Sequence, residues 1–312
     1  MTETQSTTPL YSDEVNLAEV VRALEEGRWS IFILTVIISL STTFVAMVLP
    51  DIYESKALLA PKSNGGDAGL SKLASQYSGL ASLAGINLEG LGNEGLSKSS
   101  LAQEKIKSLA FFSEHLYEDV VVDLMAVKFW DPTSGGIRYD EDIYDSLNRK
   151  WVREVDFPKR IKPSAQESHE KFLEVLSVTE DQASGLIELV VEHESPIVAQ
   201  YWVQIVLDRV SEELRKNDIL EAEESINFLK DQREETSLVS LDEIFAQLIE
   251  EQTKTIMLAR VSRNYVFDVI DPPVVSEFKS KPQRVLISVL GAILGSVLGV
   301  VIVLIRYFTR SK

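Results

Sequence analysis

The sequence of 312 residues contains no cysteine and only three histidines. Without cysteine the chain forms no disulfide, carries no thiol nucleophile and offers no thiolate ligand to a metal. The histidines, His115, His169 and His193, do not have the spacing of a metal-binding pair, so we assign them structural or surface roles. We therefore expect no cofactor, no metal site and no catalytic residue.

Basic residues are also scarce, and the net charge is −17. This balance argues against nucleic acid as a partner and against anionic lipid bound through a broad basic surface. The phosphate-binding pattern G-x-x-x-x-G-K-[ST] is absent. Acidic residues are so numerous that some pair lies ~5–9 Å apart by chance, so a glycan hydrolase with paired carboxylates gains little support.

Two long apolar runs lie near the ends of the chain. Val285 to Ile305 contains 21 residues without a charge after Arg284, and a second uncharged run, Trp29 to Leu49, ends before Asp51. At ~1.5 Å per residue, each can cross the ~30 Å hydrocarbon core of a bilayer. A cleaved signal peptide is the alternative for the first run, but 28 residues precede it and no A-x-A pattern follows it. We predict transmembrane helices at 29–49 and 285–305.

Before the first run, a short amphipathic helix is predicted to end at Gly27 and to lie along the membrane surface. In the second run, Gly291, Gly295 and Gly299 are four residues apart and share one helical face. Small residues at this spacing let another helix approach closely, which matters where lipid supplies no hydrophobic drive. Glycine is also common in membrane helices in general. We expect these three glycines to form a packing face for another helix.

Two spans place both ends of the chain on one side of the membrane. Three basic residues follow the second run and two precede the first, while three others stand on the opposite flank of the second run. The balance favours cytoplasmic tails at 1–28 and 306–312. The loop between the spans, 50–284, carries 42 acidic and 26 basic residues and so holds nearly all of the charge excess.

The first part of this loop begins with a predicted strand, 52–61, that leaves the membrane. A stretch over 64–98 follows and holds eight of the fifteen glycines. Helical spacing over Leu70–Leu83 is predicted to stop at Gly85, and the remainder is a loop that docks on another surface, for instance a neighbouring subunit.

A bent helix or a helix pair is predicted over 99–124, with Ser100 as its N-cap and Gln103 completing a capping box. The apolar positions expected to be buried are Leu101, Ile106, Leu109, Phe112 and Leu116. The polar stretch 129–164 that follows contains the acidic run Asp140, Glu141 and Asp142, but it matches no metal-ligand spacing, so we interpret it as a solvated loop rather than a cation site.

The segments 172–179 and 186–193 are predicted to form a β-hairpin with Gly185 in the left-handed conformation. Ser195 and Pro196 then begin a long helix, about 196–236. A second helix, about 240–262, begins with a capping box of Ser240 and Glu243. The expected apolar stripe of the long helix consists of Ile197, Trp202, Ile205, Val206, Val210, Leu214, Ile226 and Leu229. The two helices fit either a helical hairpin or one kinked helix.

A last strand is predicted at 265–270. Because it and the strand at 52–61 both adjoin membrane spans, their pairing in one sheet would hold the spans together. The expected fold is therefore an α/β membrane protein with two spans, a membrane-proximal α/β base and a long projecting helix or helical hairpin.

Several segments resemble one known family. They are L-I-E-E-Q-T-K-T-I-M-L-A at 248–259, Y-V-F-D-V-I-D-P-P-V-V at 265–275 and K-S-K-P-Q-R at 279–284, which run into the glycine-bearing span. E-V-N-L-A-E-V-V-R-A-L at 14–24 and I-Y-E-S-K-A at 52–57 are similar too. Together with the order of the elements, they resemble the polysaccharide co-polymerase family, the Wzz-type chain-length determinants of bacterial inner membranes. Region 127–165 carries little of this resemblance.

The resemblance implies a homo-oligomeric ring of periplasmic domains that catalyses no reaction. It implies joint action with the inner-membrane polymerase to set the length of O-antigen or a related glycan, with the growing glycan and membrane lipid as further contacts. The family's Pro- and Gly-rich segment implies that Pro272, Pro273 and Pro282, with Gly291, Gly295 and Gly299, serve helix packing or contact the polymerase. Some relatives carry a tyrosine kinase after the second span, and we do not expect that branch here, because only seven residues follow the span.

Other glycan products and other classes of protein remain as alternatives. The product of the pathway could be an exopolysaccharide or an enterobacterial-type glycan rather than O-antigen. A periplasmic sensor would need a separate cytoplasmic output protein, because the tails are too short to fold a domain. An efflux-type adaptor with a helical hairpin normally has one anchor, so the second span argues against it.

Overall fold

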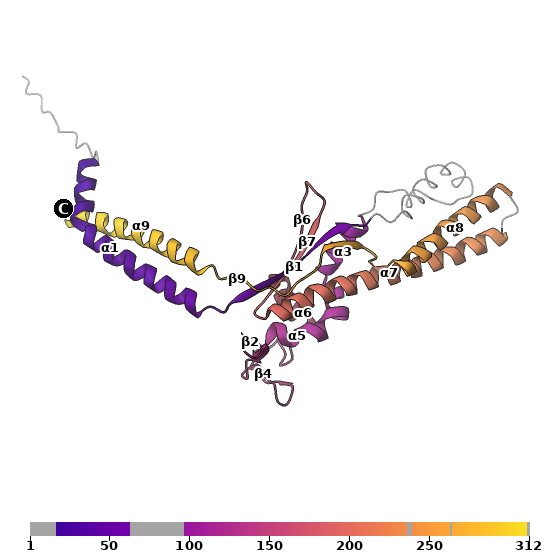
Figure 1. Cartoon of the computed structure of the whole chain (residues 1–312), viewed down its shortest axis with the longest axis horizontal. Helices are drawn as coiled ribbons and strands as arrows, with labels where there is room; N and C mark the ends of the chain where they lie inside the picture. The colour runs from indigo at the N-terminus through magenta and orange to yellow at the C-terminus, as the bar shows by residue number, and fades with distance from the viewer. Residues whose placement is uncertain (1–16, 63–96, 236–238, 263, 311–312) are drawn as a thin grey trace, which may run out of the picture. The chain divides into compact units, whose positions relative to one another are not determined.

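The computed structural model describes residues 17–62, 97–235, 239–262 and 264–310, and its element labels are those of Figure 1. The chain divides into two compact units. The helical unit consists of Met1–Asp51 and Ser280–Lys312, and the central unit consists of Ile52–Lys279. The predicted helix over Leu70–Leu83, its stop at Gly85 and the loop beyond it lie outside the described residues.

Two long helices form the helical unit and lie side by side (Figure 1). Helix α1 spans Leu17–Val48 and α9 spans Arg284–Arg310. Their segments Leu24–Val48 and Arg284–Tyr307 are long and apolar enough to cross a membrane. Most of their large apolar side chains are exposed, which is the arrangement expected of helices surrounded by lipid.

Helix α1 is continuous through Gly27, so the predicted helix end at this glycine is wrong. A glycine inside a helix costs roughly 0.5–1 kcal/mol relative to alanine. Here it has a packing role, because a Cβ atom on Gly27 would lie 2.3 Å from Val303 Cγ1 of α9. The presence of glycine at position 27 is therefore explained by the close approach of α1 and α9, and not by the end of a helix.

A five-stranded sheet forms the base of the central unit, in the order β6-β7-β1-β8 with antiparallel neighbours, and β9 also pairs with β1. The strands are β1 (Ile52–Pro61), β6 (Leu176–Glu180), β7 (Ile187–His193), β8 (Phe267–Asp271) and β9 (Lys279–Lys281). The register of β1 on β7 runs from Tyr53 opposite His193 to Leu59 opposite Ile187. As predicted, the strand at 52–61 pairs directly with the strand expected at 265–270, with Leu59 of β1 opposite Val269 of β8.

The β6–β7 hairpin turns through Gly185, which has a φ of 69° as its predicted left-handed conformation requires. The Asp181 carboxylate stabilises the turn by accepting hydrogen bonds from the Ala183 N–H at 3.0 Å and the Ser184 hydroxyl at 2.7 Å. The predicted start of the hairpin at residue 172 is wrong. Residues 172–175 are the last turn of α6 (Ala165–Val175), whose N-cap Ser164 accepts from the Glu167 N–H.

The predicted long helix is confirmed as α7, Pro196–Glu235, which begins after Ser195. It is followed by α8, Val239–Val261, and the two helices lie antiparallel as a helical hairpin rather than one kinked helix (Figure 1). Because α8 begins at Val239, Ser240 lies inside its first turn and is not its N-cap. On α7, Ile197 is exposed and lies outside the buried stripe, whereas Trp202, Val206, Val210 and Leu214 are buried as expected.

The predicted bent helix over 99–124 consists of four short pieces. They are α3 (Lys98–Ile106), α4 (Leu109–Phe111), the π-helical η1 (Phe112–Leu116) and α5 (Tyr117–Met125). The N-cap of α3 is Ser97 and not Ser100, since the Ser97 hydroxyl accepts from the Ser100 N–H at 3.1 Å. Gln103 does not complete a capping box and instead donates to Glu180 of β6 at 2.8 Å. Ser108 caps α4, which explains the break after α3.

The interpretation of 129–164 as a plain loop is wrong in part, because this stretch and its flanks form two small hairpins. One joins β2 (Val127–Asp131) to β3 (Gly136–Tyr139), and the other joins β4 (Tyr144–Asp145) to β5 (Lys150–Trp151). Edge-on ring contacts connect Tyr139 to Tyr144 at 5.7 Å and Tyr144 to Trp151 at 5.1 Å. Aromatic packing therefore organises a stretch that its polar composition predicts to be unstructured.

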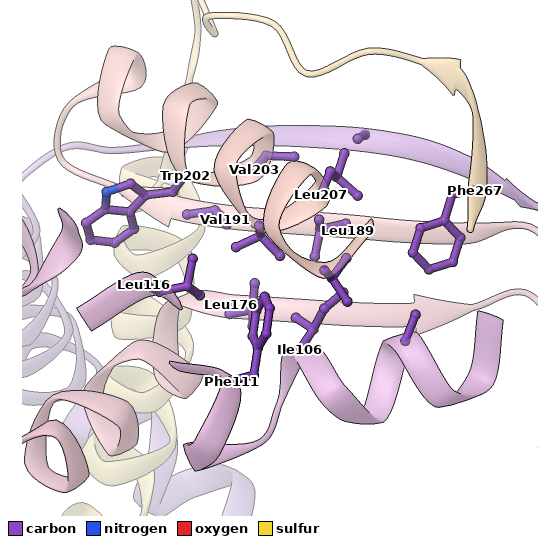
Figure 2. Packing of buried hydrophobic residues seen from close by; sticks show 14 of the residues in the cluster. Ile106, Phe111, Leu116, Leu176, Leu189, Val191, Trp202, Val203, Leu207 and Phe267 are labelled. Atoms are coloured by element: carbon purple, nitrogen blue, oxygen red, sulfur yellow. The ribbon is translucent and has the colours of Figure 1, made fainter. Parts of the chain in front are cut away.

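The core of the central unit lies where α7 covers the sheet (Figure 2). Trp202, Val203 and Leu207 of α7 pack with Leu189 and Val191 of β7. The cluster continues through Leu176 and the short helices, where Phe111 is buried while the expected core residues Leu101 and Leu109 are exposed. The other core residues labelled in Figure 2 are Ile106, Leu116 and Phe267.

Candidate functional site: a glycine face and a proline segment

Gly295 and Gly299 of α9 lie directly against the backbone of α1. A Cβ atom on Gly295 would be 3.0 Å from Thr35 Cα, and one on Gly299 would be 3.1 Å from Ile31 Cα. Such separations are tight for a real side chain, and a backbone atom cannot rotate away. These two glycines therefore set how closely α1 and α9 approach each other.

Gly291 faces a side chain instead of the backbone. A Cβ atom there would be 2.0 Å from Thr42 Oγ1, so a larger residue would displace that threonine. With Gly27 opposite Val303, close approaches extend along most of the length of the helix pair. The three predicted glycines thus face α1 of the same chain. Gly27 belongs to the same interface but was interpreted from the sequence as a helix stop.

Polar contacts join the two helices at the end where α1 finishes and α9 begins. The Thr43 hydroxyl donates to Ser288 Oγ at 2.9 Å. The Arg284 guanidinium donates to the Ala46 carbonyl at 3.2 Å and to Asp51 Oδ1 at 2.8 Å. From the sequence, Arg284 and Asp51 are only the charges that bound two apolar runs. Arg284 and Asp51 carry opposite charges and stand at the same end of two antiparallel apolar helices. From this sequence feature the ion pair could have been predicted.

The three predicted prolines are divided between the two units. Pro272 and Pro273 follow β8 in the central unit, whereas Pro282 precedes α9 in the helical unit. Pro272 is exposed and Pro273 is buried, with its carbonyl accepting from Gln200 Nε2 of α7 at 3.4 Å. The carbonyl of the next residue, Val274, accepts from the Ser55 hydroxyl of β1 at 2.8 Å. The carbonyls of Pro273 and Val274 therefore fasten the segment after β8 to α7 and β1.

An open groove of ≈ 580 Å³ borders Pro272 and Pro273. Its α7 side is polar and charged, and its β8 side is apolar. The lining residues are Gln204, Leu207, Asp208, Ser211, Glu212, Arg215, Asn264, Phe267 and Val269, besides the two prolines. The groove is suited to a polar chain rather than a small apolar ligand, since apolar ligands occupy more enclosed sites.

The histidines make structural contacts. The Ser195 N–H donates to His193 Nδ1 at 2.9 Å, so the other ring nitrogen carries the proton and donates to the Asp123 carbonyl at 3.0 Å. His169 Nε2 lies 2.9 Å from the Lys107 carbonyl oxygen. Within the described part of the chain, no three His, Asp or Glu side chains are grouped so that they could hold a metal ion.

Two family models match the chain. The model described as "Chain length determinant protein" (Wzz) matches residues 13–118. The model described as "G-rich domain on putative tyrosine kinase" matches residues 238–308. The chain belongs to the Wzz-type chain length determinant family. No curated protein matches it.

Solved structures similar to this Wzz-type chain include a "full-length bacterial polysaccharide co-polymerase". That structure is 13% identical, with a TM-score of 0.38, over 95% of this chain and 99% of its own. A "Fragment of WzzB, Polysaccharide Co-polymerase from Salmonella Typhimurium" is 14% identical, with a TM-score of 0.31, over 74% of this chain and 100% of its own.

The two family matches cover different parts of this Wzz-type protein. The first includes α1, β1 and the short helices up to the start of α5, and the second includes α8, β8, β9 and α9. The interface in which Gly291, Gly295 and Gly299 of α9 face α1 therefore joins the second matched segment to the first. The stretch between the matches, 119–237, contains the β2–β5 hairpins and α7.

Proposed function

We propose that this protein regulates the length of a polysaccharide without catalysing a reaction, and that the polysaccharide is the O-antigen of lipopolysaccharide. In this proposal several copies form a homo-oligomeric ring in the bacterial inner membrane and act as a scaffold beside the O-antigen polymerase. The growing glycan is a further candidate ligand. The alternative product is an exopolysaccharide or an enterobacterial-type glycan.

The observation that carries this proposal is the pairing of the two family-matched ends of the chain. Residues 13–118 and 238–308 are distant in sequence. They nevertheless meet twice, once where β1 pairs with β8 and once where α1 packs on the glycines of α9. Two independent contacts between the matched segments support a chain built as one anchored scaffold.

The proposed membrane topology follows from the two apolar helices. Residues 29–49 and 285–305 cross the inner membrane, with the tails 1–28 and 306–312 in the cytoplasm, and the apolar segments Leu24–Val48 and Arg284–Tyr307 contain nearly all of these two spans. Region 50–284 lies in the periplasm, and the exposed apolar faces of α1 and α9 contact lipid. This topology is supported by the basic residues that flank the outer ends of both helices.

The proposed roles of the site residues differ between the glycines and the prolines. Because α1 covers Gly291, Gly295 and Gly299, we assign these glycines to packing of the helix pair. The exposed Pro272 and the half-buried Pro282 are then the positions assigned to contact with the polymerase. Pro273 is buried and serves the local fold.

The test is deletion of the gene in its native strain, with complementation by the full chain. Lipopolysaccharide is separated on a gel, and secreted polysaccharide is sized in parallel. We expect the deletion to replace a modal cluster of band lengths by an even decline, and the full chain to restore the cluster. An altered size only in the secreted polysaccharide would select the alternative glycan. If both profiles stay unchanged, chain-length control is not the function.

A further inference from the structure

A basic segment stands out on this acidic protein. Residues 147–162, which we call the basic lobe, contain six Lys or Arg residues and two acidic residues, a net charge of +4, whereas the whole chain carries −17. The lobe includes the turn of the β4–β5 hairpin and the segment that leads to α6. It also lies in the stretch that neither family model matches.

Large apolar side chains of the basic lobe are exposed. Phe157 and Leu147 are 97% and 96% exposed, and Ile161 is 59% exposed. Phe157 and Leu147 are the two most exposed large apolar side chains among the described residues, whereas Phe111, Phe112 and Phe172 of the same unit are buried. Basic residues alternate with them along the chain, because Arg149 and Lys150 follow Leu147 closely.

The basic lobe is held in a defined shape. The Arg153 guanidinium donates to Glu167 of α6 at 2.8 and 2.6 Å, to the Ile161 carbonyl at 2.9 Å and to the Arg160 carbonyl at 2.7 Å. Lys159 adds an ion pair to the same carboxylate at 3.6 Å. One buried side chain thus closes the loop that presents Phe157 and Ile161 to solvent, so their exposure does not arise from a loose loop.

The basic lobe is also tied to the start of β1. Tyr53 packs edge-on against Trp130 of β2 at 5.3 Å, and β2 pairs with β3. From β3, the ring contacts of Tyr139 with Tyr144 and of Tyr144 with Trp151 lead into the lobe. Tyr53 lies five positions after Val48, the last residue of the apolar helix α1. Five residues extend no farther than ~18 Å. The tie therefore limits the distance between the lobe and the bilayer that α1 enters.

We propose that the basic lobe docks on the membrane surface, with Lys and Arg at anionic phospholipid headgroups and Phe157, Leu147 and Ile161 inserted at the interface. Basic residues next to exposed aromatic and aliphatic side chains are the composition of interfacial anchors. The inference rests on the membrane anchoring proposed above, and not on chain-length control. Docking of this kind would fix the central unit on the bilayer without a further spanning helix.

A neighbouring copy of the chain is the competing occupant, since its surface is acidic. The exposed apolar side chains favour lipid, because a purely electrostatic contact to an acidic surface would not require them. Among the described residues, Arg149 and Arg160 make no ion pair and are exposed, so they are available to headgroup phosphates.

The absence of cysteine makes a site-specific test direct. A nitroxide label is placed on Leu147→Cys in the full chain, reconstituted in phosphatidylcholine alone or mixed in equal parts with phosphatidylglycerol. Collisions with oxygen report lipid, and collisions with a water-soluble nickel chelate report water. We expect the label to lose nickel accessibility in the anionic mixture at low salt, and to regain it in phosphatidylcholine alone or at high salt, where screening weakens the attraction.

Matched controls use other exposed positions. A label on Ala183→Cys, in the β6–β7 turn at the opposite end of β1, should stay accessible to nickel in both bilayers. The pair Arg149→Glu and Arg160→Glu should restore nickel accessibility at residue 147. The pair Lys216→Glu and Lys230→Glu on α7 changes the charge equally and should have no effect.

Other outcomes overturn the proposal. A residue 147 label that is open to water in both bilayers excludes docking. Protection that is equal in detergent and in both bilayers, and that is lost when the oligomer dissociates, assigns the lobe to a second copy instead. A label on Val297→Cys of α9 distinguishes failure of the docking proposal from failure of the proposed membrane anchoring. If it contacts lipid while residue 147 contacts water, only the docking fails, and if it contacts water, the anchoring itself is wrong.

Discussion

At the scale of single residues, the four interface glycines differ in what they face. Gly295 and Gly299 meet backbone atoms of α1, whereas Gly291 and Gly27 meet side chains. A threonine or valine side chain can rotate, but a backbone moves only with its whole helix. Substitution should therefore be tolerated least at Gly295, where the nearest atom is 3.0 Å away.

The first prediction concerns Gly295→Leu. The added side chain should separate α1 from α9 at a cost of about 1–3 kcal/mol of packing free energy. Membrane insertion should persist, because leucine is more apolar than glycine. The measurement is disulfide formation between Thr43→Cys and Ser288→Cys, whose hydroxyl oxygens are 2.9 Å apart in the native chain, together with the polysaccharide ladder.

We expect the cross-link to form more slowly in Gly295→Leu and the modal length to be disturbed. Val297→Phe, which adds bulk on the exposed side of α9, is the matched control and should change neither. A normal ladder and normal cross-linking in Gly295→Leu would show that the close approach is not needed. Cross-linked dimers instead of an internal cross-link would place the partner α1 in a neighbouring subunit.

A second residue-scale prediction concerns Glu167. Its hydrogen bonds with Arg153 hold the pKa of this carboxyl below its ordinary value of 4.5. Since the folded state binds the proton less readily than the unfolded state, the pair stabilises the fold above pH ~4.5 and loses this effect as the pH falls through the lowered pKa. Glu167→Gln should cost about 1 kcal/mol at neutral pH, because solvent near the pair reduces its effect.

The measurement is thermal unfolding of the full chain in detergent between neutral and acidic pH. The difference in Tm between the native chain and Glu167→Gln should shrink as the pH falls below about 4.5. Glu170→Gln, an exposed position on the same helix, is the control. A Tm difference that is constant across this range would mean that the charge of Glu167 does not carry the stabilisation.

At the scale of elements, α7 organises the central unit because one of its faces covers the sheet. Trp202 is completely buried, with the rings of His193 at 4.9 Å and Phe172 at 5.9 Å. It therefore joins α7 to β7 and to α6 at one point. Tyr201, the preceding residue, is 47% exposed and makes none of these ring contacts.

The third prediction compares two truncations on α7. Trp202→Ala should lower the free energy of unfolding by about 3–5 kcal/mol, because it leaves a cavity in the core. Tyr201→Ala should cost far less, since about half of this residue is already exposed to solvent. Circular dichroism during thermal unfolding of the full chain measures both. Equal losses from the two variants would contradict the assignment of the core to this face of α7.

At the scale of the whole molecule, charge opposes the assembly of several copies. Region 50–284 carries 42 acidic and 26 basic residues, so each subunit brings a net −16 to a ring. Like charges repel over a Debye length of about 30 Å at 0.01 M salt and about 8 Å at 0.15 M. Apolar and helix-packing contacts must exceed this repulsion for a ring to form.

The fourth prediction is that the proposed homo-oligomer becomes more stable as salt increases. Light scattering of the full chain in detergent should give a larger share of assembled species at 0.15 M than at 0.01 M salt, because the screening length is shorter. Dissociation by added salt would indicate that ion pairs between subunits dominate. A monomer mass at every salt concentration would remove the ring from the proposed function.

The sequence by itself determined the elements whose signal is local or compositional. The two apolar helices, the long α7 with its Ser-Pro start and the turn at Gly185 follow from hydropathy, capping and backbone freedom, which act within a few residues. The pairing of β1 with β8 was also predictable, since both strands adjoin the apolar helices. The family resemblance rested on the same terminal segments that the family models match.

Only the tertiary structure decided what each ambiguous residue faces. Gly27 has the same local signal as a helix stop, and α9 makes it a packing glycine. The capping-box pattern with Gln103 favours Ser100 as the cap, and hydrogen-bond geometry selects Ser97. The aromatic contacts that fold the β2–β5 stretch, and the Arg153–Glu167 pair that shapes the basic lobe, join residues that no local pattern links. Contacts between distant residues depend on the whole fold, which one stretch of sequence does not specify.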